Sequence, residues 1–376
     1  MTSGVYIHIP FCEQRCYYCA FTVAVSREET YEPYVKRVIR EIELSGWQES
    51  PETLFFGGGT PSMLKGPLIQ RIIDAFPPGS SEVSLEANPG TFDAEKLESY
   101  RKAGVNRISL GAQSFDDQDL KTAGRLHKAA DVFSDFETLR RHGFSNINID
   151  LIAGLPNQQF DVWKTNVDWI RRLAPEHVSI YMLELDEKSS WSKNTPDLHA
   201  DDEFARFYNA ACDWLEEIGY VHYEISNWAL PGYECRHNLK YWTGAPYRGF
   251  GVGAHSFDKE SRFWNTASLS EYAVQIDAGR LPIADREVQT RDIQLEEAFM
   301  LGLRQTAGFN IQTVAKELGI HYPSDWLTRV TELQSAGFVS FDGTILKLTP
   351  AGWLIATGIT EELLWPTLLS ISEATR

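Results

Sequence analysis

Hydrophobic and polar residues recur along the first part of the chain in a pattern that predicts repeated strand–helix units. The predicted strands are Val5–Ile9, Thr53–Phe56, Glu82–Ala87, Arg107–Leu110, Ile147–Ile152 and His177–Met182. The amphipathic segments between them include Glu32–Glu43, Ala94–Ala103, Val132–His142 and Val162–Leu173. Strands that alternate with helices in this way indicate a parallel sheet, either open or closed into a barrel.

Several of these strands carry a polar residue at every second position. The alternation is strict in Asn146–Asp150 and Glu82–Ala87, and weaker in Tyr6–Ile9. A parallel strand covered by helices on both faces should be almost continuously apolar, so the polar positions indicate a face that looks into an accessible lumen. A partly exposed sheet is the alternative. We therefore predict an α/β fold: an incomplete β/α barrel of about six parallel strands.

The pattern changes after position 230. Residues 231–290 are rich in Gly, Trp, Tyr and Asn and predict a connecting region. Helical periodicity returns in the last segment, followed by a hairpin that turns at Asp342–Gly343. The helices predicted there are Leu295–Gln305, Ile311–Leu318 and Trp326–Ser335. We predict three parts, 1–230, 231–290 and 291–376, of which the last is a smaller, winged-helix-like helical domain that serves packing or docking.

Composition and charge narrow the classes of partner. The 376 residues include 35 Lys and Arg against 52 Asp and Glu, a formal net charge of −17. A phosphate-binding surface needs a basic face, so no nucleic-acid partner is expected. No apolar run has the length of a membrane span, and the N-terminal residues lack a secretory signal pattern. We expect a cytoplasmic location, where clustered cysteines indicate metal binding instead of disulfides.

Three of the five cysteines, Cys12, Cys16 and Cys19, follow directly after the first predicted strand. Thiolates favour iron–sulfur clusters, zinc or copper(I). A four-iron cluster ligated by only three cysteines keeps one iron open, where a small molecule can bind. His8 could instead complete a Cys₃His zinc site, but it lies inside the predicted strand, and no second Cys/His pair follows. We predict a 4Fe-4S cluster.

The spacing C-x₃-C-x₂-C, with aromatic Tyr18 before the last cysteine, resembles the radical SAM superfamily. That resemblance implies S-adenosylmethionine bound at the open iron and cleaved to a deoxyadenosyl radical by one electron, supplied by a flavodoxin- or ferredoxin-like donor. Longer motifs resemble the oxygen-independent coproporphyrinogen III oxidase family over nearly the whole chain. These motifs are Tyr6–Cys12, Gly57–Ser62, Leu110–Phe115, Gly124–His127 and Asp150–Pro156.

The same resemblance implies the residues that line the S-adenosylmethionine site. They are Tyr6, Tyr18, Gly58, Gly59, Thr60, Glu86, Gln113, Arg125 and Asp150. The glycine-rich turn is expected to expose N–H donors to a ligand and to grip the methionyl amine. Taken singly, each polar side chain in this set could equally be a satisfied surface or lumen group.

Two departures point away from the oxidases toward their HemW branch of heme chaperones. Phe21 stands where the oxidases carry a further cysteine, and only eleven residues precede Cys12. The HemW-type signature His-Asn-x-x-Tyr-Trp is present from His237 to Trp242. The resemblance then implies heme binding and delivery to a respiratory acceptor protein, with peripheral membrane contact during delivery. The alternative is oxidative decarboxylation of coproporphyrinogen III, so enzymatic activity is left open.

Three residues are candidates for binding heme iron: His237, Cys235 and His255. Histidine and thiolate are both established axial ligands of heme iron, and the many aromatic residues could stack on a porphyrin. The alternative for both histidines is a hydrogen-bonded imidazole buried between domains. No Cys-x-x-Cys-His motif occurs, so covalent attachment of the cytochrome type is not indicated. Cys212 lies in a helical run and is expected in the core.

Overall fold

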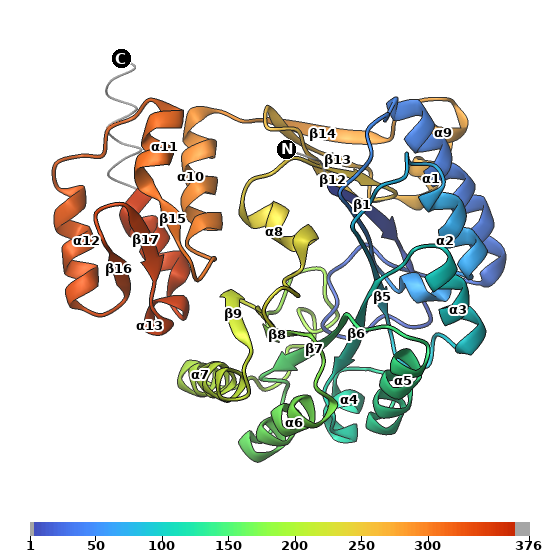
Figure 1. Ribbon diagram of the computed structural model, residues 1–376, viewed down its shortest axis with the longest axis horizontal. Helices are drawn as coiled ribbons and strands as arrows, with labels where there is room; N and C mark the ends of the chain where they lie inside the picture. The colour runs from blue at the N-terminus through green and yellow to red at the C-terminus, as the bar shows by residue number, and fades with distance from the viewer. Residues whose placement is uncertain (1–3, 365–376) are drawn as a thin grey trace.

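The computed structural model describes residues 4–364 (Figure 1). All six predicted strands are present as neighbours in one sheet, in the order β1-β4-β5-β6-β7-β8, and each pairs in parallel with the next. Their bounds are β1 Gly4–Ile9, β4 Thr53–Gly58, β5 Glu82–Ala87, β6 Arg107–Gln113, β7 Ile147–Ala153 and β8 His177–Met182. The predicted α/β partial barrel is therefore confirmed.

Helices cover the outer side of the arc formed by these strands (Figure 1). They are α1 Tyr31–Ser45, α2 Gly66–Ile73, α3 Ala94–Lys102, α4 Asp117–Thr122, α5 Ala129–Arg141, α6 Phe160–Leu173 and α7 Asp201–Glu217. The apolar positions of the strands, such as Ile7, Leu110 and Ile149, are fully buried against them. The alternating polar positions therefore face the inner side, because successive side chains of a strand point to opposite faces.

The sheet extends beyond the predicted strands at both ends to twelve strands in all. β11 (Tyr247–Phe250) pairs in parallel with β1, and an antiparallel run follows it. This run is β12 His255–Phe257, β13 Ser261–Asn265 and β14 Ile283–Val288. At the other end, β10 (Asn227–Ala229) and β9 (Val221–Glu224) continue from β8. None of these added strands was predicted. β9 to β12 have three or four residues each, too few to show a clear period of two, whereas β13 and β14 have five and six residues and were missed.

One helix of this region lies on the inner side of the arc. It is α8 (Arg236–Trp242), whereas α9 (Leu269–Asp277) packs against α1 (Figure 1). The Glu82 carboxylate fixes the start of α8, because it accepts from the N–H groups of Arg236 (3.0 Å) and His237 (3.1 Å). A carboxylate at a helix N-terminus satisfies free donors and interacts favourably with the helix dipole.

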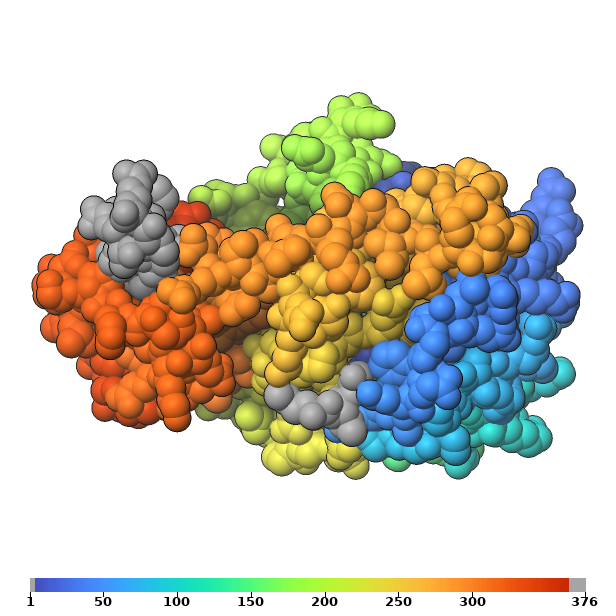
Figure 2. All heavy atoms as spheres, turned by 90° about the horizontal axis from the view of Figure 1, so that it is seen from above, coloured from blue at the N-terminus to red at the C-terminus, as the bar shows by residue number. Residues whose placement is uncertain are grey.

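The C-terminal segment forms a lobe at one end of the molecule (Figure 2). Its elements are α10 Arg291–Gly302, β15 Phe309–Asn310, α11 Ile311–Leu318, α12 Trp326–Ser335, β16 Val339–Phe341, β17 Ile345–Leu348 and α13 Pro350–Trp353. The predicted helices and hairpin are thus present. This segment has its own apolar cluster around Phe299, Trp326 and Leu346. Among residues 4–364, no helix combines the length and the apolar character needed to cross a membrane.

Candidate functional site

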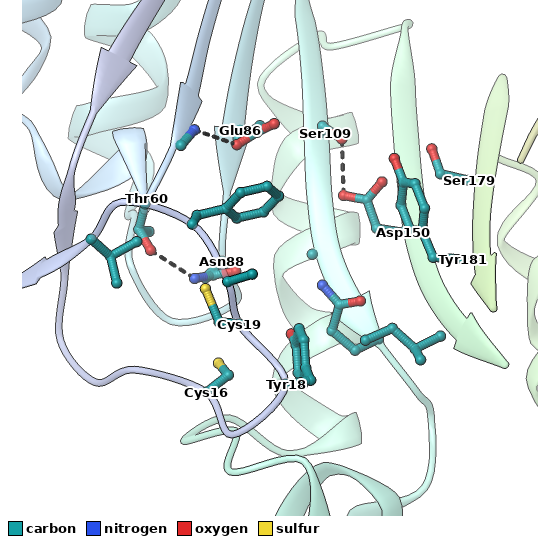
Figure 3. A pocket seen from close by; sticks show the side chains of 18 of the residues that line it. Cys16, Tyr18, Cys19, Thr60, Glu86, Asn88, Ser109, Asp150, Ser179 and Tyr181 are labelled. Carbon is teal, nitrogen blue, oxygen red and sulfur yellow. Dashed lines mark hydrogen bonds between the residues drawn. The ribbon is translucent and has the colours of Figure 1, made fainter. Parts of the chain in front are cut away.

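A pocket of about 510 Å³ lies on the inner side of the barrel. Its wall includes the carboxyl ends of the parallel strands, where α/β folds place their ligands. Polar side chains at alternate strand positions point into it, as Figure 3 shows for Glu86, Ser109, Asp150 and Ser179. The lumen that the alternation predicted is therefore this pocket.

The three cysteines of the motif lie on one loop at the mouth of the pocket. Short strands β2 (Phe11–Cys12) and β3 (Ala24–Val25) pair in parallel and join the two ends of this loop. Cys12, Cys16 and Cys19 all line the pocket. Cys12 Sγ lies 3.5 Å from Thr60 Oγ1, and Cys16 Sγ lies 3.5 Å from Arg125 Nη1. Figure 3 shows Cys16 and Cys19 near the polar side chains of the strands.

The electrostatics of the loop suit metal coordination. Burial raises the pKa of the Cys12 thiol to about 11, and burial also raises the pKa of Cys19. Part of the rise for Cys12 comes from Cys19 and Cys16, and part of the rise for Cys19 comes from Cys16, because neighbouring thiolates repel each other. A bound metal reverses this balance by stabilising thiolates directly. Three soft sulfur donors at one pocket mouth therefore fit the predicted cluster.

His8 does not complete a zinc site with these cysteines. Its Nδ1 lies 3.1 Å from the Tyr6 hydroxyl and its Nε2 lies 2.7 Å from the Thr22 carbonyl oxygen, so both ring nitrogens are engaged. Within residues 4–364, no three His, Cys, Asp or Glu side chains are grouped closely enough to hold a single metal ion. The observation that favoured zinc is thereby removed. Cys212 packs against the main core, as expected.

The glycine-rich turn after β4 joins the mouth of the pocket to the sheet. Gly58 has φ +112°, and an added Cβ would lie 2.4 Å from the His8 ring. Its N–H donates to Glu86 Oε2 (3.1 Å), while the N–H groups of Gly59 and Thr60 donate to the carbonyls of Ile9 (2.8 Å) and Phe11 (2.7 Å). The expectation that these N–H donors are exposed to a ligand was therefore wrong. They instead fasten the turn to Glu86 and to the segment that leads into the cysteine loop.

Two carboxyl groups face the same pocket. Burial, and after it the charge of Asp150, raise the pKa of Glu86 to about 8. Asp150 accepts from Ser109 Oγ (3.0 Å) and Asn148 Nδ2 (2.7 Å), yet burial still raises its pKa above the usual value. A ligand that brings positive charge or hydroxyl donors would stabilise both ionised carboxylates.

Arg125 links the cysteine loop to the strand ends. Its Nη2 donates to Asn88 Oδ1 (2.6 Å) and to the Gly111 carbonyl (2.7 Å), and its Nη1 lies 3.5 Å from the Tyr18 hydroxyl. Gln113 ends β6 with φ +70°, which is uncommon for a residue with a side chain. Such strained positions are concentrated at ligand sites.

All nine residues predicted to bind S-adenosylmethionine line this pocket. The fold brings together side chains from β1, the cysteine loop, the glycine turn and the ends of β5 to β7.

The three candidate heme ligands are not brought together. His237 lines the pocket floor, but its Nδ1 lies 2.8 Å from Thr53 Oγ1 and its Nε2 lies 2.8 Å from the Tyr241 hydroxyl. Burial lowers the pKa of His237 to about 3. Cys235 is buried outside the lining, with Sγ 3.7 Å from Glu82 Oε1. His255 is exposed on β12 and stacks on Trp264 at 5.5 Å.

Several lining residues were not singled out from the sequence. They are Asn88, Arg107, Ser109, Asn148, Ser179 and Tyr241. The signal for four of them was present, because they occupy the polar positions of alternating strands. Arg107, Ser109 and Gly111, for example, stand at every second position of β6 and all line the pocket.

Comparisons with known proteins agree with this geometry. The sequence model of the radical SAM superfamily matches residues 6–170, and that of the HemN C-terminal domain matches residues 289–355. The chain is 34% identical to the heme chaperone HemW of Bacillus subtilis (strain 168) over 371 residues, which cover 95% of this chain and 98% of the relative.

A second relative and a solved structure extend the comparison. The heme chaperone HemW of Synechocystis sp. is 36% identical over 332 residues, which cover 82% of this chain and 79% of the relative. The structure of coproporphyrinogen III oxidase (HemN) from Escherichia coli is similar with a TM-score of 0.84 at 22% identity. This match covers 98% of this chain and 90% of that chain, and at this identity it shows a shared fold.

Proposed function

This chain belongs to the HemW family within the radical SAM superfamily, and we propose that it is a heme chaperone that binds a 4Fe-4S cluster, S-adenosylmethionine and heme and delivers the heme to an acceptor protein. The observation that carries this proposal is the pocket mouth, where three cysteine thiols and two buried carboxyl groups face one space. Phe21, at the position of the additional cysteine of the oxidases, is 65% exposed at the pocket rim.

Cys12, Cys16 and Cys19 would hold the cluster as thiolates. When bound, such a cluster supplies an electron to S-adenosylmethionine at its open iron, and a flavodoxin- or ferredoxin-like protein would renew that electron. The Arg125 guanidinium, 3.5 Å from Cys16 Sγ, would offset part of the negative charge of the thiolates. Its bonds to Asn88 and Gly111 hold it in that position.

Glu86 and Asp150 would bind the cationic and hydroxyl groups of S-adenosylmethionine. With a pKa of about 8, the Glu86 carboxyl holds a proton at neutral pH before such a ligand arrives. Positive charge next to it lowers its pKa, so the proton leaves Glu86 as the ligand binds. The glycine turn would contribute carbonyl oxygens to the methionyl amine, since its N–H groups are already engaged.

Heme would be the cargo of the protein, and His237 is the candidate ligand that the pocket wall contains. Its low pKa keeps the imidazole neutral at physiological pH, which is the form that binds iron. Iron binding would replace one of its two hydrogen bonds, to Thr53 or to Tyr241. Heme ligation by Cys235 or His255 would place the heme outside this pocket lining. A respiratory protein would be the acceptor of the heme.

Titration of cluster-loaded protein with hemin tests this proposal. We expect a saturable Soret shift. The affinity for hemin should fall at least about tenfold in His237→Ala, which corresponds to about 1.4 kcal/mol for the lost bond between His237 and iron. The matched control is His142→Ala, at the end of α5 and outside the pocket lining, which should bind as the unmodified protein does. Absence of saturable binding would contradict the proposal. So would anaerobic turnover of coproporphyrinogen III with S-adenosylmethionine and a low-potential reductant, because turnover indicates an oxidase.

A further inference from the structure

Arg107, at the start of β6, brings to the pocket wall a positive charge that forms no close ion pair among residues 4–364. The residue is 2% exposed and lines the pocket. Its Nε is buried and has no hydrogen-bond partner within residues 4–364. The ion pairs of the described chain, such as the partly exposed pairs Arg140 with Glu176 and Arg262 with Glu297, do not include it. A buried charge is normally paired, because removing it from water is costly.

The two carboxyl groups that act on the Arg107 charge, Glu82 and Asp150, accept hydrogen bonds from other donors. Glu82 accepts from the start of α8, and Asp150 accepts from Ser109 and Asn148. The guanidinium charge also acts on two neighbouring histidines. After burial, it is the next cause of the lowered pKa of His177, and it also lowers the pKa of His237. This cation is balanced at longer range by carboxyl groups, since Glu82 and Asp150 raise the pKa of Arg107 and Arg107 lowers that of Glu86. What Arg107 lacks, among the described residues, is a direct hydrogen-bond acceptor for its Nε.

Aromatic rings form the wall beside this cation. Phe55 stacks between Tyr6 (ring centroids 6.2 Å apart) and His237 (5.1 Å), and Tyr241 meets His237 edge to face at 5.2 Å. All four residues line the pocket. A wall of ring faces suits a flat or apolar ligand body.

We propose that the pocket floor, defined here as Arg107 with the rings of Tyr6, Phe55 and Tyr241, binds a carboxylate-bearing ligand whose apolar body packs on the rings. A planar guanidinium pairs with a carboxylate through two parallel hydrogen bonds. Ser109, Asn148 and Ser179 add only uncharged polar groups to this part of the wall. A carboxylate adds less negative charge than a phosphate beside Glu82, Glu86 and Asp150, which already interact with the Arg107 charge.

This carboxylate differs from the one that S-adenosylmethionine places beside the cluster. Arg107 precedes Gly111, which accepts from Arg125, by four positions of β6, and a strand rises about 3.3 Å per residue. Arg107 and Gly111 therefore lie about 13 Å apart along the strand. Where the proposed function holds, the ligand at the floor is a porphyrin propionate; a free organic acid has the same recognition chemistry.

The test compares hemin with hemin dimethyl ester, which lacks free propionates, on cluster-loaded protein. We expect hemin to bind at least about tenfold more tightly, equivalent to about 1.4 kcal/mol. Arg107→Met should bring this ratio close to one while leaving the affinity for the ester unchanged, and Arg107→Lys should give an intermediate ratio. Arg248→Met is the matched control: Arg248 is also an arginine with buried, unpartnered nitrogens, but it lies outside the pocket lining. A ratio that persists in Arg107→Met overturns the proposal.

A second arm uses sodium propionate as the probe and the Tm of the same proteins as the measurement. Propionate should raise the Tm of the unmodified protein and of Arg248→Met, but not that of Arg107→Met. If neither hemin nor its ester binds, the proposed function fails and this arm alone decides the inference. A propionate effect without a hemin preference assigns the floor to a small free acid. Equal propionate effects in all variants, or none in any, overturn the inference, and the lysine variant preserves the test if the methionine variant does not fold.

Discussion

The mouth and the floor of one pocket are built in opposite ways. At the mouth, the hydrogen-bond contacts of the Cys12 and Cys16 thiols are long, as between Arg125 Nη1 and Cys16 Sγ (3.5 Å), and the carboxyl pKa values are raised. Beside the floor, His237 is bonded at both ring nitrogens. Behind the lining, His177 is bonded in the same way, to Asn148 (2.7 Å) and to the Tyr223 hydroxyl (2.7 Å). The thiols at the mouth are left for bound groups to complete, whereas the imidazoles near the floor already have their partners.

Because the mouth and the floor differ in this way, a group without a hydrogen-bond partner has a different meaning in each region. Thiols and carboxyl groups with shifted pKa values at the mouth are the ordinary condition of a metal and cofactor site. The buried Nε of Arg107, which lacks an acceptor within the described chain although the side chains around it are hydrogen-bonded, has no such explanation and supports a ligand there. The same strands supply both regions: in β7, Asn148 belongs to the floor network and Asp150 to the mouth.

The largest expected effect concerns the cysteines of the mouth. Replacement of Cys16 by alanine leaves two thiolates for the cluster, so the iron content after anaerobic reconstitution should fall from about four per chain to close to zero. Iron and sulfide analysis measures this. Cys212→Ala removes a thiol that packs against the core, away from the pocket lining, and should keep its full iron content. Equal iron content in both variants would contradict the claim that Cys16 holds the cluster and Cys212 does not.

A smaller loss is expected when a mouth carboxylate becomes an amide. Asp150→Asn keeps the shape but loses the charged acceptor, and a hydrogen bond to a charged group contributes about 1.5–3 kcal/mol. The affinity for S-adenosylmethionine should therefore fall roughly 10- to 100-fold, as measured by equilibrium dialysis. Asp135→Asn is the control, because Asp135 accepts from the Gly90 N–H outside the pocket lining. Unchanged affinity in Asp150→Asn would place the cofactor elsewhere.

The sequence predicted the parts of the molecule that follow from local patterns. The six parallel strands and the polar lumen follow from alternation in segments such as Asn146–Asp150. The heme candidates show the limit of that reasoning. Cys235 and His237 are close in sequence, but residues two apart on a helix do not face the same side, and His255 is on a strand that packs elsewhere. The partners of the glycine-turn N–H groups and the isolation of Arg107 depend on tertiary packing, which no local pattern encodes.

The junction between mouth and sheet should be sensitive to one methyl group. In Gly58→Ala, the new methyl group would both strain a backbone of positive φ and clash with the His8 ring. We therefore expect the free energy of unfolding to fall by about 1–3 kcal/mol. Gly46→Ala also has a positive φ (+68°), but its Cβ would meet nothing within 4 Å. Urea unfolding of both variants separates the clash from the backbone strain. An equal loss in the two variants would mean that the turn is not held against His8.

The smallest expected effect is a pH dependence confined to the mouth. Below its pKa of about 8, Glu86 is protonated and must release that proton when a cationic ligand binds, whereas above this pKa it is already ionised. The affinity for S-adenosylmethionine should therefore rise by about tenfold in all above pH 7, roughly fivefold of it by pH 8, and level off above about pH 9, because a group of this pKa is about one-tenth ionised at pH 7 and about half ionised at pH 8. Calorimetric titration over this range measures it. Glu86→Gln should flatten the profile, and a profile unchanged by that substitution would assign the proton to another group.

Electron paramagnetic resonance of the reduced, anaerobically reconstituted protein tests the central claim most directly. If three cysteines leave one iron of the cluster open at the mouth, the spectrum should be that of a reduced 4Fe-4S cluster, and addition of S-adenosylmethionine should change it. In Asp150→Asn the same change should need a higher concentration of S-adenosylmethionine. A spectrum that S-adenosylmethionine does not alter, or a metal that gives no signal upon reduction, would contradict the claim.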